Sequence, residues 1–328
     1  MTKLSLSVAV GDYDRTRALI DGAVAIDGVD PVYMTLGPEE IFFRAFRAAE
    51  FDICELSLSS YTLKTAQGNC PYIAVPAFLS RAFRHNSIYV RTDRVQRPAD
   101  LKGRKVGVPE YQLTANVWVR AFLDDDYGVK PADIHWIRGG IEEPGRPEKL
   151  AVQLPAGVRL DEAPEGTTIS ALLAAGEIDG FIAPRLPSAV EGHPNIGPLF
   201  ADPAATAADY CKRTGFFPIM HVLGIRRSLA GQHPWLPSAV LKAFEAAKQL
   251  AVAKLADTAA TRVTLPFVAE MLGAARALLG PDFWSYGVAA NRKLLDYFLA
   301  QHYAQGLSAR RLAVDELFHP ATYETFKV

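Results

Sequence analysis

The stretch ADLKGRKVGVPEYQLTANVWVRAFL, residues 99–123, is decisive for the fold class. A short helical turn ends at Gly103, and an apolar run over residues 105–108 is typical of a buried strand. A loop containing Pro109 then leads into a long helix with apolar residues at helical spacing. Strands followed at once by helices build parallel sheets. The stretch therefore predicts an α/β fold.

The same order of elements is predicted on both sides of this stretch. Downstream, a helix over residues 169–175 ends at Gly176, a residue suited to the left-handed conformation of a helix end, and a strand follows over 179–182. Upstream, strands and helices alternate, which predicts a mainly parallel sheet covered on both faces. The predicted upstream elements are a strand over 4–10, a helix over 14–25, a strand over 32–36, a helix from Pro38, a strand over 51–56 and a serine-rich turn over 57–60.

The chain is long enough for two domains, since 328 residues exceed the typical size of one domain, about 150. The segments AAEFDICELS (48–57) and AAGEIDGFIAP (174–184) share one pattern: each runs from a helix into a strand whose start contains Asp, and then changes to polar residues. This shared pattern predicts two lobes of similar topology. We assign residues 1–93 and 220–328 to lobe 1 and 94–219 to lobe 2, with crossings near 91–98 and 217–223. The Gly- and Pro-rich segment 139–166 is a long excursion of lobe 2, and 237–302 is strongly helical.

Composition and charge exclude several classes of partner. The net charge of -1 provides no global basic field for nucleic acid or an anionic membrane, and no stretch of 18 apolar residues predicts a membrane span. Arg supplies 23 of the 35 cationic residues, which favours anionic ligands. Three cysteines without ligand spacing, and a first strand that begins near Met1 without a signal peptide, predict a cytoplasmic protein. A homo-oligomer is compatible with the sequence.

Polar residues that directly follow predicted strands are the candidates for ligand binding, because ligands bind at the carboxyl ends of strands in open α/β sheets. Two lobes facing each other across a cleft would bring these residues together. They are Asp12 and Arg15 after the first strand, Ser57, Ser59 and Ser60 after the strand over 51–56, Glu110, Tyr111 and Thr114 after 105–108, and Arg185 after 179–182.

Arg81 and Arg84 form a second candidate, because residues three apart in a helical turn point the same way and could clamp a carboxylate. The alternative is a solvated surface turn. His85 follows them, and His221 lies among apolar residues near the second crossing. A histidine there is either a hydrogen-bonded core residue or a proton carrier.

Acidic residues leave similar alternatives. Glu55 lies inside a strand and could pair with an Arg, and Asp14 could cap the first helix. Glu110 precedes a helix whose free N–H groups favour an anion. A metal held by Asp12, His85, Glu110 and His221 has no spacing signal, so we predict none. The sequence lacks GxGxxG, GxxxxGK[ST], HExxH and GxSxG, the signatures of nucleotide binding, zinc proteolysis and α/β-hydrolase chemistry.

Long strings of the sequence resemble the 4,5-dihydroxyphthalate decarboxylase family. They are GDYDRTRAL (11–19), PEEIFFRAF (38–46), EFDICELSLSSY (50–61), FRHNSIYVR (83–91), DLKGRKVGVPEYQLTANVWVR (100–120), GGIEEPGRPEK (139–149), GEIDGFIAPR (176–185) and RTGFFPIMH (213–221). The resemblance implies an α/β, two-lobed type II periplasmic-binding-protein-like fold, here with a helical C-terminal segment. It also implies decarboxylation of a hydroxylated aromatic dicarboxylate, most simply 4,5-dihydroxyphthalate to protocatechuate and CO2 in phthalate degradation.

This reaction needs no cofactor, because a phenol para to the leaving carboxylate supplies the electron density. Residue type and strand-end position lead us to predict His221 as proton donor, Glu110 with His85 as phenol-side base, and Arg81, Arg84 and Arg185 as carboxylate anchors. The ligand would be a small aromatic carboxylate. The rival hypotheses are a solute-binding protein that delivers an aromatic acid or vitamin precursor to an ABC transporter, and a lyase for another carboxylated ring or enol compound.

Overall fold

The computed structural model describes residues 2–145 and 148–323 and divides the chain into two compact units. Unit 1 comprises the chain up to Arg81, Ile219–Leu299 and the chain from Leu312. Unit 2 comprises Ala82–Pro218 and Ala300–Arg311. The sequence analysis expected the changes of lobe after residues 93 and 219. In the structure the chain leaves unit 1 after Arg81, returns at Ile219, and also contributes a C-terminal piece to unit 2.

Unit 1 is built on a mixed five-stranded sheet in the order β2-β1-β3-β11-β4. The strands β1, β2 and β3 are parallel, whereas β11 runs antiparallel to both of its neighbours. The predicted parallel arrangement is thus confirmed for the first three strands, and β11 inserts the returning chain between β3 and β4. The strands span Leu4–Val10 (β1), Val29–Thr35 (β2), Ile53–Ser57 (β3), Tyr72–Arg81 (β4) and Ile219–Arg226 (β11).

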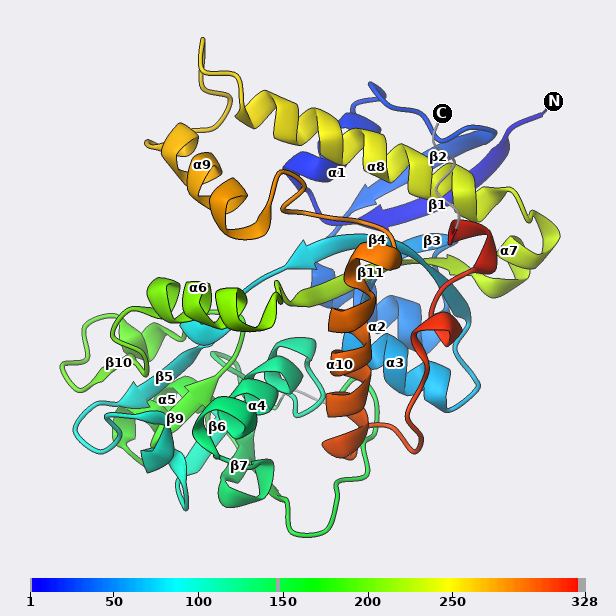
Figure 1. The fold of residues 1–328 in the computed structure, drawn as a ribbon. Coiled ribbons are helices and arrows are strands. Elements are labelled where there is room, and N and C mark those ends of the chain that lie inside the picture. The colour runs from blue at the N-terminus through cyan, green and yellow to red at the C-terminus, as the bar shows by residue number, and fades with distance from the viewer. Residues whose placement is uncertain (1, 146–147, 324–328) are drawn as a thin grey trace. The chain divides into compact units, whose positions relative to one another are not determined.

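Helices cover both faces of the unit 1 sheet, as predicted. Helices α1 and α8 pack together over one face, and α2 and α3 lie on the other (Figure 1). Helix α2 begins at Pro38 as predicted, with acidic Glu39 and Glu40 in its first turn. The helices are α1 (Asp14–Ile20), α2 (Pro38–Ala48), α3 (Leu58–Ala66), α7 (Arg227–Gln232), α8 (Leu236–Leu255), α9 (Val268–Leu279) and α10 (Arg292–Ala304), the last of which ends in unit 2.

Unit 2 repeats this topology. Its sheet has the order β10-β5-β9-β6-β7-β8, in which β6, β7, β8 and β9 are parallel and β5 runs antiparallel to β9. The run β7-β6-β9-β5-β10 matches β2-β1-β3-β11-β4, so the predicted similarity of the two lobes is confirmed. The elements are β5 (Ile88–Arg91), β6 (Lys105–Val108), α4 (Thr114–Tyr127), β7 (His135–Arg138), β8 (Arg159–Glu162), α5 (Ile169–Ala175), β9 (Gly180–Ile182), β10 (Ile196–Pro198) and α6 (Pro203–Thr214).

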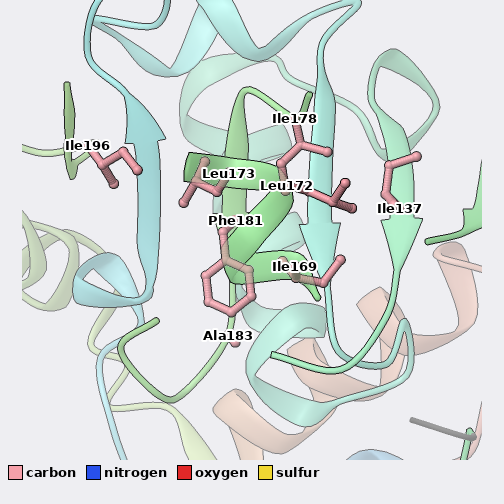
Figure 2. Packing of buried hydrophobic residues seen from close by; sticks show 8 residues of the cluster. All are labelled: Ile137, Ile169, Leu172, Leu173, Ile178, Phe181, Ala183 and Ile196. Atoms are coloured by element: carbon pink, nitrogen blue, oxygen red, sulfur yellow. The ribbon is translucent and has the colours of Figure 1, made fainter. Parts of the chain in front are cut away.

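The core of unit 2 forms where α5 packs on the sheet (Figure 2). Ile169, Leu172 and Leu173 of this helix lie against Ile137 of β7 and Phe181 of β9. Gly107 in β6 allows this approach, because a Cβ there would lie 2.5 Å from Ile169 and 2.9 Å from Ile178. Helix α5 is capped at its N-terminus by Thr168, whose side chain accepts the Ala171 N–H, and at its C-terminus by Gly176, which has a φ of +72°.

Four local predictions differ from the structure. The first helix ends at Ile20 rather than residue 25, and the serine-rich segment 57–60 begins helix α3 instead of forming a turn. The C-terminal region is divided among α8, α9 and α10 rather than continuously helical. The predicted excursion 139–166 contains strand β8, while residues 146 and 147 lie outside the described residues. No described helix is long and apolar enough to cross a membrane.

Candidate active site

A buried carboxylate and a histidine meet on adjacent strands of unit 1. In the antiparallel pairing of β3 and β11, His221 lies opposite Ser57 and Leu223 lies opposite Glu55. Glu55 and His221 are therefore diagonal neighbours on one face of the sheet, within reach of long side chains. Their side chains are hydrogen-bonded, with 2.6 Å between Nδ1 of His221 and Oε1 of Glu55. The pair brings together residues 166 positions apart in sequence.

The Glu55 carboxylate is fully buried and accepts three further contacts from the chain around Gly11. The Gly11 N–H donates to Oε2 at 3.0 Å, and the Tyr13 hydroxyl lies 3.0 Å from Oε1 and 3.2 Å from Oε2. Burial by itself would raise the pKa of Glu55, but the hydrogen bond and charge of His221, with the Gly11 and Tyr13 donors, lower it. Glu55 is therefore a carboxylate at neutral pH.

The turn that carries Gly11 and Tyr13 is pinned by Thr16. Its Oγ1 accepts the Tyr13 N–H at 3.0 Å and donates to the Gly11 carbonyl at 2.8 Å. Gly11 is needed because the Tyr13 ring packs directly over it: a Cβ at residue 11 would lie 2.2 to 2.6 Å from three atoms of that side chain. Burial, followed by the charge of Glu55, raises the pKa of Tyr13, so its hydroxyl stays a protonated donor.

These contacts settle which His221 nitrogen carries a proton toward Glu55. A carboxylate can only accept, so Nδ1 of His221 is protonated and donates to Glu55. The Nε2 atom is then left to exchange a proton with a bound molecule. The His221 side chain remains 17% exposed, and its ring packs edge-on against Phe42 at 4.8 Å between centroids. This is the geometry of an oriented acid–base group.

The other unit 1 residues predicted to bind substrate have varied surroundings. Arg15 lies between the Tyr13 and Trp284 rings, 4.1 and 4.6 Å from their centroids, and therefore close to the Glu55 cluster. Asp12 is exposed and forms an ion pair with Arg17. Ser57 precedes helix α3, and Ser59 and Ser60 lie buried in its first turn.

The expectation that Arg81 and Arg84 share a helical turn is wrong. Arg81 is the last residue of β4 in unit 1, whereas Arg84 lies beyond the change to unit 2. Arg81 lies in a strand because β4 pairs with β11 as far as the Arg81–Ile219 register. Arg81 Nη2 donates to the Ser285 carbonyl at 2.6 Å and to Asn291 Oδ1 at 2.5 Å. Burial lowers the pKa of both arginines to about 10.

Unit 2 holds a second buried carboxylate, Glu110, with a different partner. Its Oε1 accepts from Lys149 Nζ at 2.6 Å, and both side chains are 0% exposed. The Lys149 N–H and the Gln112 side chain donate to Oε2 at 3.2 and 3.3 Å. Glu148 accepts the Tyr111 N–H at 2.9 Å, and burial raises the pKa of Glu148 to about 7. Lys149 and Glu148 were not predicted as site residues.

The remaining unit 2 residues predicted from the sequence have different surroundings. Tyr111 packs edge-on against Trp136, with the Arg120 guanidinium 3.8 Å above the Tyr111 ring. Thr114 is the buried first residue of α4, and Arg185 is exposed in the loop after β9. His85 stacks on Phe122 at 4.2 Å, beside Phe200 and Tyr210. Burial lowers the pKa of His85 to about 4, so it is neutral at pH 7.

The roles predicted for these residues stay predictions. Glu110 and His85, proposed to act together, have different immediate partners: Lys149 for the first and aromatic rings for the second. Among the described residues, no group of three or more His, Cys, Asp or Glu side chains could hold a metal ion.

Sequence reasoning missed that Glu55 is the partner of His221 and that Tyr13 completes the cluster. One signal was present: Glu55 is an acidic residue between Cys54 and Leu56 in an otherwise apolar strand, where a charge requires a partner. The identity of that partner depends on β11 pairing with β3, which no local pattern encodes.

Two solved structures with a similar fold are named as sulfonate-binding proteins. The alkanesulfonate-binding protein SsuA from Xanthomonas axonopodis pathovar citri, bound to MOPS, matches over 97% of this chain and 99% of its own, with a TM-score of 0.54 and 14% identity. A putative sulfonate-binding SsuA from Methylobacillus flagellatus matches over 98% of this chain and 93% of its own, with a TM-score of 0.55 and 15% identity. The predicted class, a type II periplasmic-binding-protein-like fold, is confirmed.

The sequence comparisons are more specific. A 4,5-dihydroxyphthalate decarboxylase from Comamonas testosteroni is 63% identical over 330 residues, covering 100% of both chains. A protein of the same name from Pseudomonas putida is 59% identical over 218 residues, which cover 66% of this chain and 84% of its own. No protein-family model matches the chain. The chain belongs to the 4,5-dihydroxyphthalate decarboxylase family, as its resemblance predicted.

Proposed function

We propose that this protein is a carboxy-lyase that converts 4,5-dihydroxyphthalate into protocatechuate and CO2. The observation that carries the proposal is the 63% identity, over the whole of both chains, with a relative named for this activity. A second, independent support is the Glu55–His221 pair, because it supplies an oriented proton donor that a protein that only binds its ligand does not need.

The substrate needs no electron sink from a cofactor. Each carboxyl carbon is attached to a ring carbon para to a hydroxyl group, so removal of a phenol proton pushes electron density toward that carbon. This electron density takes up the proton at the ring carbon and converts the phenolate into a ketone. Cleavage of the carbon–carbon bond then releases CO2, and its bonding pair restores the aromatic ring and the phenolate. The protein must provide a base for the phenol, an acid for the ring carbon and an anchor for the retained carboxylate.

His221 is the proposed acid. Its Nδ1–H is held by the Glu55 carboxylate at 2.6 Å, which orients the ring and stabilises the positively charged imidazolium that donates from Nε2. Tyr13 and Gly11 in turn hold Glu55 in place. His221 thus acts on the substrate, while Glu55 and Tyr13 act through His221 as positioning residues.

For the phenol-side base we retain the predicted candidates Glu110 and His85. Arg81, Arg84 and Arg185 stay predicted anchors for the carboxylates of the substrate. The Lys149 ion pair and the aromatic packing of His85 give both candidates a structural reason to be present as well. A cytoplasmic location is also part of the proposal, supported by three free, buried thiols at Cys54, Cys70 and Cys211.

One experiment separates the proposal from its rival. Purified protein is incubated with 4,5-dihydroxyphthalate, and the mixture is resolved by chromatography. We expect protocatechuate and CO2, and in deuterated water one deuterium on the ring carbon that lost its carboxylate. Tight binding with the ligand recovered intact would overturn the enzyme proposal and support a solute-binding protein, the class in which the SsuA structures fall by name.

A further inference from the structure

The ladder between β4 and β11 is irregular beside His221. His221 pairs with Ser80, but Leu223, two residues later, pairs with Val75. The four residues 76–79 of β4 therefore lie against the single residue Val222. A bulge of this kind releases backbone groups from the ladder and occurs often next to functional sites. The carbonyl groups of this segment are consequently available to other partners.

Three groups use these carbonyls. The Gly287 N–H donates to Pro76 O at 2.8 Å, and the indole N–H of Trp284 donates to Phe78 O at 2.9 Å. Arg15 Nε donates to Leu79 O at 2.6 Å. The bulge thus fixes two separate parts of the chain beside each other: the guanidinium of Arg15 and the segment 284–287.

Arg15 is held rigidly by these contacts. Its guanidinium is stacked between the Tyr13 and Trp284 rings, and its side chain is 16% exposed. With Nε committed to Leu79, the N–H groups on Nη1 and Nη2 remain, and the structure shows Nη1 in a 3.3 Å contact with the half-exposed carboxylate of Asp14. A planar, preorganised guanidinium of this kind suits a carboxylate ligand.

Tyr286, in the same segment, has an unused hydroxyl. The residue is 8% exposed, and its Oη has no hydrogen-bond partner within residues 2–145 and 148–323. Its ring packs edge-on against Phe78 at 6.3 Å, and Lys248 Nζ lies 4.8 Å from the ring centre. Burial raises the pKa of Tyr286, so the hydroxyl is a protonated donor, and Arg15 is the foremost charge acting on it. Since buried donors are nearly always satisfied, a partner is expected.

We propose that the Tyr286 hydroxyl and the Arg15 guanidinium together bind the retained carboxylate of an aromatic acid and place its ring for proton transfer from His221. This inference rests on the proposed function for the identity of the ligand. The two donors and the Glu55–His221 pair are linked through Tyr13, whose ring stacks on Arg15 and whose hydroxyl binds Glu55. Tyr286 carries no signal in the sequence that distinguishes it from other aromatic residues of the C-terminal segment.

The test is Tyr286→Phe, which removes only the hydroxyl. Because an unsatisfied buried hydroxyl destabilises the free protein, we expect thermal stability to stay equal or rise. The dissociation constant of protocatechuate, measured by calorimetry, should rise by about 10- to 100-fold, the range for losing a hydrogen bond to a charged group. The matched control is Tyr33→Phe, which removes another buried hydroxyl without a partner among the described residues and should leave binding unchanged.

A ligand series decides which group the pair holds. Catechol keeps the ring and both hydroxyls of protocatechuate but lacks the carboxylate, so Tyr286→Phe and Arg15→Met should leave its binding unaltered. The dicarboxylate is tested in a His221→Asn background to prevent turnover. There, Tyr286→Phe should weaken its binding by the same factor as the binding of protocatechuate. Weakening of the dicarboxylate alone would show that the pair holds the leaving carboxylate and would overturn the proposal, as would unchanged binding of all three ligands.

These binding measurements do not depend on catalysis. If the unmutated protein fails to form protocatechuate, the proposed function falls, but the Tyr286→Phe series still reports whether Arg15 and Tyr286 bind a carboxylate. If product forms and Tyr286→Phe binds protocatechuate normally, the subsite falls while the function stands.

Discussion

Two fully buried carboxylates, one in each unit, show how similar local chemistry serves different purposes. Glu55 in unit 1 and Glu110 in unit 2 are both 0% exposed, and each lies 2.6 Å from a nitrogen of a basic side chain. The difference lies in the partner. His221 is 17% exposed and keeps a second ring nitrogen for proton exchange, whereas Lys149 is 0% exposed. A buried charge with a reachable partner can act on a ligand, and one with an enclosed partner mainly organises its surroundings.

The sharpest test of this comparison is His221→Asn. Asparagine preserves a polar side chain near Glu55 but cannot act as an acid, so turnover should fall by about 10² or more while ligand binding is retained. Steady-state kinetics with the substrate and calorimetry with protocatechuate measure the two quantities. Undiminished turnover would remove His221 from the mechanism.

The matched control is His135→Asn. His135 also lies 2.6 Å from a carboxylate oxygen, but its partner Asp161 is 48% exposed. We expect turnover close to that of the unmutated protein. An equal loss in both variants would mean that histidine–carboxylate pairs affect the rate through general stability rather than through the chemistry.

The second prediction concerns the enclosed pair. Lys149→Met leaves Glu110 buried without its cation, which should lower the free energy of unfolding by about 3–5 kcal/mol, measured by denaturant titration. The double variant Glu110→Gln/Lys149→Met removes both charges and should recover most of this loss. Equal free energies of unfolding for the single and the double variant would contradict a coupled Glu110–Lys149 ion pair.

The same double variant also tests the predicted role of Glu110 in catalysis. If Glu110 mainly organises unit 2, the folded double variant keeps most of its turnover. If turnover is lost while the protein stays folded and binds protocatechuate, Glu110 is the phenol-side base that the sequence analysis predicted, and the two carboxylates are alike after all.

The third prediction addresses how Glu55 is supported. Gly11→Ala introduces a Cβ that would lie 2.2 Å from the nearest Tyr13 atom, so the Tyr13 ring must move away from Glu55. Such overpacking should destabilise the protein by about 1–3 kcal/mol, and the displaced hydrogen bond should reduce turnover by about tenfold. Gly231→Ala, where an added Cβ meets nothing within 4 Å, is the control. Matching kinetics in the two variants would show that Tyr13 does not position Glu55.

Much of the fold was predictable because its signals are local. Pro38 marks the start of α2, Gly176 the end of α5, and the apolar run over 105–108 is strand β6. The segment 57–60 was mistaken for a turn because serines favour turns and helix N-termini alike, and here they start a helix. Local composition does not distinguish these two outcomes.

The candidate site was less predictable because it depends on contacts between distant parts of the chain. The sequence drew attention to His221 and Glu110, but their partners lie 166 and 39 positions away. The functional difference between them follows from strand pairing and from the exposure of the partner. Arg81 and Arg84 illustrate the reverse error. Their spacing of three residues suggested a shared helical turn, but Arg81 is the last residue of strand β4.

The smallest expected effect, and the last test of the comparison, concerns Glu148. Its pKa is raised by burial from the ordinary value of 4.5 to about 7, opposite in direction to Glu55. The folded protein therefore holds this proton more tightly than the unfolded chain. Stability from Glu148 is fully present below about pH 4.5 and is lost as the pH rises toward about 7. For Glu55, whose pKa is lowered, stability is instead lost as the pH falls.

Glu148→Gln makes this position permanently neutral. As the pH rises from about 4.5 to 7, the free energy of unfolding of the variant should therefore increase relative to that of the parent. Denaturant titrations at several pH values measure this difference, and they cancel the titration of all other groups. A constant difference across this pH range would mean that the Glu148 carboxyl titrates normally, and that burial beside Tyr111 imposes no charge penalty in unit 2.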